Sequence, residues 1–276
     1  MKYIVSKHCG FCSGVKRAVE SAYKNAGENT VTYGELIHNK IVVDKLAEKG
    51  VTAVNDISQC IGKKVIVRSH GAGKDFFDKA SALGIEVIDA TCPFVKKIHD
   101  IVYRHYIDGY HIAIIGKAGH PEVEGTNGWC ENTASIVDDE KAAEALVHFE
   151  RMCFVTQTTY LLEKYLRILK KIRKLPFKTV EIFNTICYTT ISRQNDAENI
   201  SRKCTKVLVI GSGNSSNTRK LMETAAGLSD VYLVESLDDL YKIKFSTNDV
   251  IGITAGASTP DELIMEVKEY MSQELG

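Results

Sequence analysis

The stretch Asp89-Ala90-Thr91-Cys92-Pro93-Phe94-Val95 decides the fold, because it marks the passage from a strand to a helix with a cysteine at the junction. An apolar run at 85–88 precedes it, and a helical pattern of apolar residues extends over 95–106. Pro93 suits the first turn of that helix, where its missing N–H leaves no hydrogen bond unmade. We therefore expect Cys92 at the carboxyl end of a strand.

Two other stretches repeat this arrangement. Phe183-Asn184-Thr185-Ile186-Cys187 follows an extended run, and Asn184 precedes its cysteine by three positions, as Asp89 precedes Cys92. Gly10-Phe11-Cys12-Ser13-Gly14 follows the short strand pattern of residues 3–5. Three such cysteines, spaced 80 and 95 residues apart in a chain of 276, predict three similar units. We place these units at residues 1–92, 93–184 and 185–276.

The composition of the 276 residues is that of an ordinary globular protein, with 44% hydrophobic and 25% charged residues. Lys plus Arg and Asp plus Glu both number 35, and this formal charge of zero argues against a nucleic-acid-binding protein. The first residues contain no apolar signal core, and no apolar run has transmembrane length, so we expect a cytoplasmic protein. Cytoplasmic thiols stay reduced, so the 8 cysteines should serve metal binding, catalysis or simple burial.

Short Val- and Ile-rich runs alternate with helical patterns, which predicts an α/β fold with mostly parallel sheets. These runs are 64–67, 111–115, 152–155, 206–210 and 249–253. The loops after them are rich in Gly, Ser, Thr and His. Ligands of such folds bind at the carboxyl ends of the strands, where helix N-termini favour anions. Together with the loop 34–39, which contains His38, these loops predict a polar, anion-binding cavity.

Other cysteines and histidines lack this strand-end context. Cys153 lies inside a strand pattern, and we interpret Cys60, Cys130 and Cys204 as structural. Cys9 forms a C-x-x-C pair with Cys12, but no thioredoxin-like unit or second close pair accompanies it. Five histidines are interpreted as surface or structural residues: His8, His99, His105, His111 and His148. On spacing alone, the cysteines at the three strand ends could share a metal or could simply be buried.

Two further patterns have weak functional signals. Gly211-Ser212-Gly213 resembles a dinucleotide-binding fingerprint with Glu235 at the end of the next strand, but Ser216 occupies the third glycine position. The serines around it favour a phosphate-binding loop. The basic run over 164–178 is interpreted as a solvated helix face.

Read together, these motifs resemble the 4-hydroxy-3-methylbut-2-enyl diphosphate reductase family, the LytB-type iron–sulfur enzymes of the last step in the non-mevalonate isoprenoid pathway. The resemblance covers nearly the whole chain and departs from the family pattern at Cys9 and Asn184. It rests on collinear motifs at 10–15, 34–39, 68–71, 89–93, 119–126, 156–159, 184–187, 214–217 and 254–258.

The resemblance implies three similar small α/β lobes around a central iron–sulfur cluster cavity. Cys12, Cys92 and Cys187 would hold a [4Fe-4S] cluster in which one iron has no protein ligand. Glu122 and Thr158 would deliver protons. The residues that match the family's substrate-binding site are His38, His70, His120, Gln157, Thr158, Ser215, Ser216, Asn217 and Ser258.

The implied reaction removes the allylic hydroxyl of (E)-4-hydroxy-3-methylbut-2-enyl diphosphate and gives isopentenyl and dimethylallyl diphosphates. The implied electron donor is ferredoxin or flavodoxin, and we expect a monomer with no nucleic-acid or membrane partner. Two alternatives are an iron–sulfur hydro-lyase acting on a phosphorylated hydroxy substrate and a non-catalytic, cluster-based redox sensor. Neither alternative needs a diphosphate site, so residues 215–217 and the three loop histidines distinguish them from the reductase.

Overall fold

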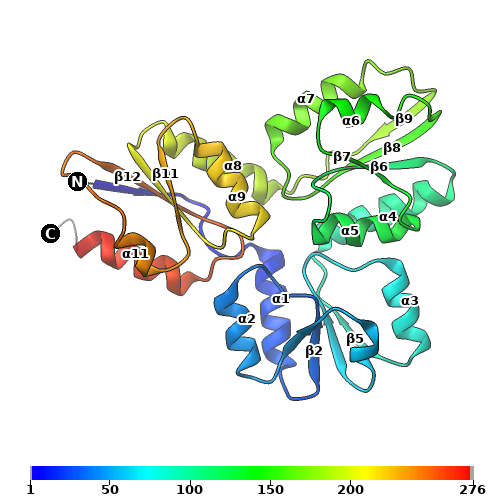
Figure 1. The fold of residues 1–276 in the computed structure, drawn as a ribbon, viewed down its shortest axis with the longest axis horizontal. Coiled ribbons are helices and arrows are strands. Elements are labelled where there is room, and N and C mark those ends of the chain that lie inside the picture. Colours follow the sequence, from blue (N-terminus) through cyan, green and yellow to red (C-terminus); the bar gives the residue numbers. More distant parts are fainter. Residues whose placement is uncertain (1, 274–276) are drawn as a thin grey trace. The chain divides into compact units, whose positions relative to one another are not determined.

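The computed structural model describes residues 2–273 and divides the chain into two compact units. The first unit comprises Met1–Lys16, His38–Val42 and Tyr188–Gly276, and the second comprises Arg17–Ile37 and Val43–Cys187. Three four-stranded sheets carry the fold, one in the first unit and two in the second (Figure 1). Every strand pair in them is parallel, so the predicted α/β fold with three parallel-sheet lobes is confirmed.

One sheet of the second unit has the strand order β3-β2-β4-β5. Its strands are β2 (Thr30–Tyr33), β3 (Thr52–Val54), β4 (Lys64–Val67) and β5 (Glu86–Asp89). Val65 and Val67 of β4 pack against Phe76 and Ala80 of α3 (Lys74–Ala82), because alternate side chains of a strand face the same side. Figure 1 shows α3 on one face of this sheet, with α1 (Ser13–Lys24) and α2 (Lys40–Ala47) toward the other.

The other sheet of the second unit has the order β7-β6-β8-β9. Its strands are β6 (His111–Ile115), β7 (Ser135–Val137), β8 (Arg151–Thr156) and β9 (Thr179–Ile182). Ile98 and Val102 of α4 (Pro93–Ile107) and Val123 of α5 (Pro121–Asn127) pack against Ile112 and Ile114 on one face. Figure 1 shows α6 (Glu140–Glu144) and α7 (Leu162–Ile172) on the opposite face.

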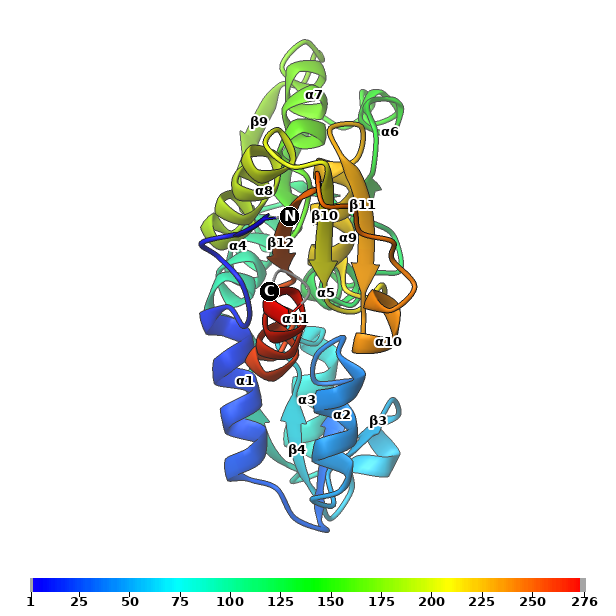
Figure 2. The same ribbon diagram turned by 90° about the vertical axis from the view of Figure 1, so that its left-hand side faces the viewer.

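The sheet of the first unit has the order β1-β12-β10-β11. Its strands are β1 (Lys2–Val5), β10 (Lys206–Ile210), β11 (Asp230–Val234) and β12 (Val250–Ala255). Val207 and Val209 pack in the cluster that contains residues of α8 (Tyr188–Ser201) and α9 (Ser216–Ala225). Leu208 and Ile210 point the other way, toward α10 (Leu237–Leu240) and α11 (Asp261–Gln273), which Figure 2 shows on that face.

All three sheets share one topology. If the strands of each lobe are numbered along the chain, both sheets of the second unit run in the order second, first, third, fourth, and the sheet of the first unit has the same order when β10, β11 and β12 are counted as its first three strands. In the first unit, however, the fourth strand is β1, whose residues Lys2–Val5 pair in parallel with β12. The predicted division at 1–92, 93–184 and 185–276 therefore needs a correction for this strand, because its hydrogen-bonding partner lies near the other end of the chain.

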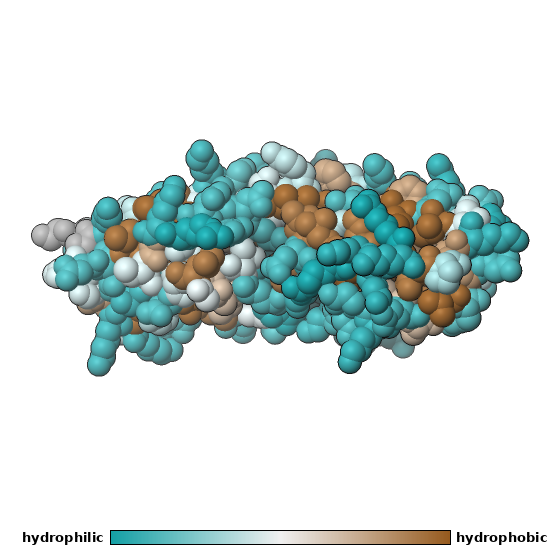
Figure 3. Space-filling view, turned by 90° about the horizontal axis from the view of Figure 1, so that it is seen from above, coloured by the Kyte–Doolittle hydropathy of each residue, from teal (hydrophilic) through white to brown (hydrophobic). Residues whose placement is uncertain are grey.

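The view in Figure 3 shows polar side chains that separate several smaller apolar areas. Exposed large apolar residues among those described lie on several elements, for example Leu166 on α7 and Val180 on β9, and three of them, Phe94, Tyr103 and Ile107, lie on α4. Of the helices within residues 2–273, none combines the length and the apolar character needed to cross a bilayer.

Candidate functional site

The predicted functional residues occupy equivalent positions in the shared topology. Between the first and third strands of each sheet the chain order changes direction, and this is where α/β sheets bind ligands. The predicted substrate and proton residues all follow a first or a third strand, and the three predicted ligand cysteines each follow a fourth strand. The residues after first strands are His38, His120, Glu122 and Ser215–Asn217, and those after third strands are His70, Gln157, Thr158 and Ser258.

The turns that present Cys92 and Cys187 are built alike. The side chain of Asp89 accepts a hydrogen bond from the N–H of Thr91 at 3.0 Å, and that of Asn184 accepts one from Ile186 at 3.2 Å. An Asx side chain that accepts from the residue two positions on stabilises a tight turn. The spacing of three residues between Asx and cysteine therefore reflects a repeated structure, and Asn184 performs the same role as Asp89.

One backbone hydrogen bond is common to all three cysteines. The N–H of Cys92 donates to Ser69 O at 3.0 Å, that of Cys187 to Thr158 O at 3.0 Å, and that of Cys12 to Ala257 O at 3.2 Å. Each acceptor lies in the loop after the third strand of the same sheet. Ser69 and Ala257 directly precede His70 and Ser258, and Thr158 is itself a predicted site residue. In every lobe, one hydrogen bond thus joins the cysteine turn to a binding loop.

The cysteines differ in how much of each side chain is exposed. Cys12, Cys92 and Cys187 are half-buried, whereas Cys60, Cys130, Cys153 and Cys204 are buried, as the sequence predicted for structural residues. Burial raises the pKa of Cys130 to about 11 and that of Cys153 to about 12, which disfavours the thiolate that metals require. Cys9 is half-buried, but its pKa is also raised by burial, and its Sγ faces Ser6 O at 3.5 Å.

Glu122 is a buried carboxyl group held by a single residue. Its side chain is 2% exposed, and its two oxygens accept the N–H of Thr158 at 2.5 Å and the hydroxyl of Thr158 at 2.6 Å. Burial raises the pKa of Glu122 to about 7, although the two hydrogen bonds from Thr158 act in the opposite direction. A carboxyl group with such a pKa can hold and release a proton near neutral pH. The predicted pairing of Glu122 with Thr158 is therefore present.

His120 caps the short helix on which Glu122 lies. Its Nδ1 accepts the N–H of Glu122 at 3.2 Å, so the ring proton belongs on Nε2 and that nitrogen is a hydrogen-bond donor. The ring of His70 meets the ring of His120 edge-on, with centroids 5.6 Å apart. Two of the three predicted loop histidines thus lie side by side in the second unit.

The amide of Gln157 connects two loops beside this pair. Its Oε1 accepts the N–H of Lys117 at 3.1 Å, and its Nε2 donates to the hydroxyl of Thr159 at 2.8 Å. Gln157 is 3% exposed, so these contacts fix the loops that carry His120 and Thr158.

The polar residues of the first unit gather at the start of α9. The hydroxyl of Ser258 lies 3.3 Å from that of Ser215, which caps the helix by accepting the N–H of Thr218 at 3.4 Å, and 3.5 Å from His38 O. Ser216 and Asn217 follow in the first turn and are 7% and 5% exposed. Within residues 2–273, the buried Nδ2 of Asn217 has no protein partner. A helix start with buried donors suits an anion such as phosphate.

The dinucleotide interpretation of the Gly211–Gly213 loop is not favoured by this geometry. Glu235 accepts the N–H of Gly213 at 2.7 Å, so its carboxylate stabilises the loop itself.

His99, which the sequence predicted to be a surface or structural residue, and Trp129 support the loop that carries His70 in the second unit. His99 is 3% exposed and stacks on Trp129, with ring centroids 5.1 Å apart, and burial lowers its pKa to about 4. Gly71 has φ +80° and lies so close that a Cβ there would meet His99 Cε1 at 2.6 Å. Trp129 also donates to Ala72 O at 3.0 Å. Neither residue has a motif context, so only their packing under the His70 loop reveals this role.

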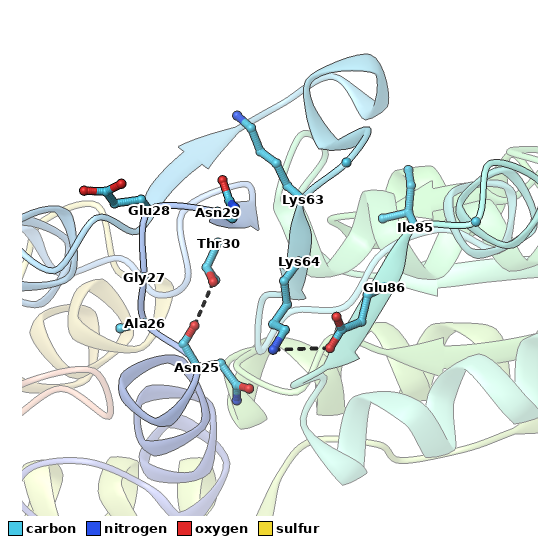
Figure 4. A pocket seen from close by; sticks show the side chains of 12 residues that line it. Asn25, Ala26, Gly27, Glu28, Asn29, Thr30, Lys63, Lys64, Ile85 and Glu86 are labelled. Carbon is cyan, nitrogen blue, oxygen red and sulfur yellow. Dashed lines mark hydrogen bonds and ion pairs between the residues drawn. The ribbon is translucent and has the colours of Figure 1, made fainter.

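A hollow of about 740 Å³ lies at the amino-terminal ends of the strands in the β3-β2-β4-β5 sheet, away from the loops described above (Figure 4). Residues 25–30, 62–64 and 84–86 line it, and they precede the strands. Lys64 pairs with Glu86 at 3.3 Å, and the Thr30 hydroxyl donates to Asn25 O at 2.7 Å. Some of its polar groups therefore contact one another, and none of the predicted site residues lines it.

Comparison with known proteins agrees with this arrangement. Residues 3–272 match the family described as LytB protein. A 4-hydroxy-3-methylbut-2-enyl diphosphate reductase of Thermoanaerobacter sp. (strain X514) is 42% identical over 275 residues, which cover 97% of this chain and 95% of that protein. The enzyme of the same name from Clostridioides difficile (strain 630) is 40% identical, with coverages of 98% and 99%.

Solved structures give the same result. The E-1-hydroxy-2-methyl-but-2-enyl-4-diphosphate reductase from Plasmodium falciparum has a TM-score of 0.88 at 28% identity, covering 98% of this chain and 87% of that one. A structure of (E)-4-hydroxy-3-methyl-but-2-enyl diphosphate reductase, the terminal enzyme of the non-mevalonate pathway, has a TM-score of 0.70 at 34% identity, covering 99% and 100%. These matches confirm the resemblance seen in the sequence. This chain therefore belongs to the LytB family, whose members are iron–sulfur oxidoreductases.

Proposed function

We propose that this protein reduces (E)-4-hydroxy-3-methylbut-2-enyl diphosphate to isopentenyl and dimethylallyl diphosphates. Two electrons and two protons enter, the allylic C–O bond breaks, one proton leaves with the hydroxyl as water, and the other forms a C–H bond. The observation that carries the proposal is the hydrogen bond in each lobe between a cysteine turn and a binding loop. The names of the relatives and of the solved structures agree with this proposed reaction.

Cys12, Cys92 and Cys187 are the proposed ligands of a [4Fe-4S] cluster. When bound, this group would supply electrons one at a time and would leave one iron without a protein ligand. The half-buried state of these three cysteines, in contrast with the buried Cys60, Cys130, Cys153 and Cys204, supports this choice. The eight free cysteines are also consistent with the proposed cytoplasmic location, where thiols stay reduced.

Glu122 is the proposed proton source. Its pKa of about 7 leaves a substantial fraction protonated at neutral pH. The hydroxyl of Thr158 contacts Glu122 at 2.6 Å and can pass a proton by donating one and accepting another. This supports the assignment of Thr158 as the relay between the carboxyl group and substrate.

The diphosphate is the proposed ligand of the polar loops in both units. In the first unit, the candidates are His38, Ser215, Ser216, Asn217 and Ser258. In the second, His120 offers a donor at Nε2, with His70 beside it, and Gln157 holds the neighbouring loops. Hydroxyl, amide and imidazole groups of this kind can donate hydrogen bonds to phosphate oxygens.

A small acidic electron carrier such as ferredoxin or flavodoxin is the proposed donor, and α7 is one docking candidate. Arg167 pairs with Glu163 at 2.8 Å and Glu140 at 3.4 Å, and Lys171 pairs with Glu144. These pairs reduce the positive charge of the helix, so we expect only a modest contribution. Changing Lys170 and Lys171 to Glu should slow protein-mediated reduction more at low salt than at high salt, without affecting chemical reductants. An unchanged rate at low salt would show that α7 is only a solvated face and does not bind the electron carrier.

The reaction is tested with the anaerobically purified chain and a reduced viologen. We expect loss of the hydroxylated diphosphate together with formation of both products, detected by mass spectrometry. A chain that retains an iron–sulfur chromophore but releases a dehydrated product without consuming viologen would instead be a hydro-lyase. A chromophore with no substrate conversion would favour the redox sensor.

A further inference from the structure

Arg193 of α8 is a buried cation with backbone partners on two separate segments. Its side chain is 3% exposed among residues of the first unit. Its Nη1 donates to His8 O at 2.6 Å and to Ala255 O at 2.9 Å, and its Nη2 donates to Gly10 O at 2.7 Å. A single guanidinium group thus holds three carbonyl groups.

These carbonyl groups belong to the two segments that meet at Cys12. His8 and Gly10 lie in the turn that leads from β1 to Cys12, and Gly10 has φ +80°, which fixes a sharp bend. Ala255 ends β12 and begins the loop in which Ala257 O accepts the N–H of Cys12 at 3.2 Å. Arg193 therefore holds the backbone on both sides of that hydrogen bond.

The same loop continues directly into the proposed phosphate-binding residues. Ser258 follows Ala257, and its hydroxyl lies 3.3 Å from that of Ser215 at the start of α9. One turn after Arg193, Asp196 accepts the hydroxyl of Ser6 at 3.0 Å and lies 2.8 Å from Nδ1 of His8. Two residues of helix α8 thus hold the chain before Cys12, and Arg193 also holds the start of the loop that leads to Ser258.

Arginine has chemical properties that lysine cannot supply here. Its planar group presents several N–H donors in fixed directions, whereas an ammonium group is a compact charge on a flexible stem. The positive charge of Arg193 also reaches the turn, because it opposes the burial-driven rise in the pKa of Cys9. A fixed positive charge near a redox centre favours the more negative, reduced form.

We propose that Arg193 is a positioning residue that holds the Cys12 turn and the Ser258 loop together and raises the reduction potential of the bound cluster. This inference rests on the proposed function. It assigns two separable effects to one side chain: the hydrogen bonds retain the cluster, and the charge sets its potential.

The test compares full-length Arg193→Lys and Arg193→Met with wild type after anaerobic reconstitution. Arg202→Met is the matched control, because Arg202 lies just beyond the end of α8 and forms an exposed pair with Glu198 at 2.6 Å. The measurements are iron and sulfide per chain, the rate of iron loss to a chelator, and the midpoint potential from a titration followed by absorbance and electron paramagnetic resonance.

Arg202→Met should match wild type in all three measurements. Arg193→Lys keeps the charge but loses hydrogen bonds, so iron loss should become about tenfold faster while the midpoint potential stays near that of wild type. Arg193→Met should lose iron at least as fast, and the cluster that remains should have a lower midpoint potential. If Arg193→Met fails to fold, Arg193→Lys still tests the hydrogen-bonding effect.

An Arg193→Lys protein with wild-type iron loss would overturn the positioning role. An Arg193→Met protein with an unchanged midpoint potential would overturn the effect of the charge. Failure of the proposed function would show differently, since wild type itself would then bind no cluster or would carry a cluster without reducing the substrate, before any residue is changed.

Discussion

Thr158 gives Glu122 both of its hydrogen-bond donors, the N–H at 2.5 Å and the hydroxyl at 2.6 Å, while its carbonyl accepts the N–H of Cys187 at 3.0 Å. One residue therefore fixes the distance between the buried carboxyl group and a cysteine turn. A shift of this loop would move the proposed proton source and the proposed cluster ligand together.

Replacing Glu122 with Gln should lower turnover by roughly 10²–10⁴-fold, the usual contribution of general acid catalysis. The amide keeps the size of the side chain but cannot deliver the proton, so iron content and substrate binding should remain. Glu124→Gln is the matched control, because Glu124 is an exposed carboxyl on the same helix. Near-native viologen-linked turnover in Glu122→Gln would exclude this carboxyl as the proton source.

Thr158→Ala should reduce turnover less than Glu122→Gln, because the backbone N–H of residue 158 still contacts the carboxyl group. Thr158→Ser restores the hydroxyl and should recover most of the activity. Single-turnover kinetics with both variants measures the step directly. Equal losses in the Ala and Ser variants would show that the methyl group, and not the hydroxyl, is what matters.

Glu122 should also make the stability of the chain depend on pH. Its pKa is about 7 in the folded chain and 4.5 in the reference state, so the folded state holds a proton that the unfolded state releases in this window. Stability should therefore fall as pH rises from 4.5 through 7. Between pH 5 and pH 8 the loss should be roughly 2–3 kcal/mol relative to Glu122→Gln. Urea unfolding of both apoproteins measures it, and parallel pH curves would contradict the shifted pKa.

His120→Asn should weaken substrate binding more than it slows chemistry. Asparagine can still cap the helix but lacks a donor at the position of Nε2, so KM should rise roughly 10- to 100-fold, with a smaller change in kcat. His148→Asn, at an exposed position, is the control. A variant whose kcat falls while KM is unchanged would place His120 in the chemical step instead.

Serine at Cys12, Cys92 or Cys187 should abolish the brown absorbance and the activity. Cys9→Ser is the sharpest control, because Cys9 is also half-buried and lies three residues from Cys12. It should retain the cluster, as should substitutions at Cys60, Cys130, Cys153 and Cys204. Full iron content in Cys187→Ser would refute the assignment of one ligand to each lobe.

Local patterns predicted the strands and their loops well, because buried parallel strands need continuous apolar residues. The runs at 64–67, 111–115 and 206–210 coincide with β4, β6 and β10. The pairing of β1 with β12 could not be predicted in this way, since nothing in Lys2–Val5 specifies a partner near the other end of the chain.

The supporting residues were missed for a related reason. His99 and Arg193 lie within ordinary helical sequence, and their roles depend on which loops the fold brings against them. Most of the predicted site motifs were visible because they contain a glycine, an Asx residue or a cysteine at a strand end, although the motif at 156–159 contains none of these. Packing partners have no such signature.

The position of β1 has a consequence for biosynthesis. During translation this strand leaves the ribosome first, yet the strand that it joins is made near the end of the chain. The β3-β2-β4-β5 sheet can close once residue 89 has emerged, whereas β1 and the Cys12 turn must wait for β12. The nascent chain should therefore present Cys92 and Cys187 in formed turns before Cys12 is in place, which would make insertion of the proposed cluster a late event in maturation.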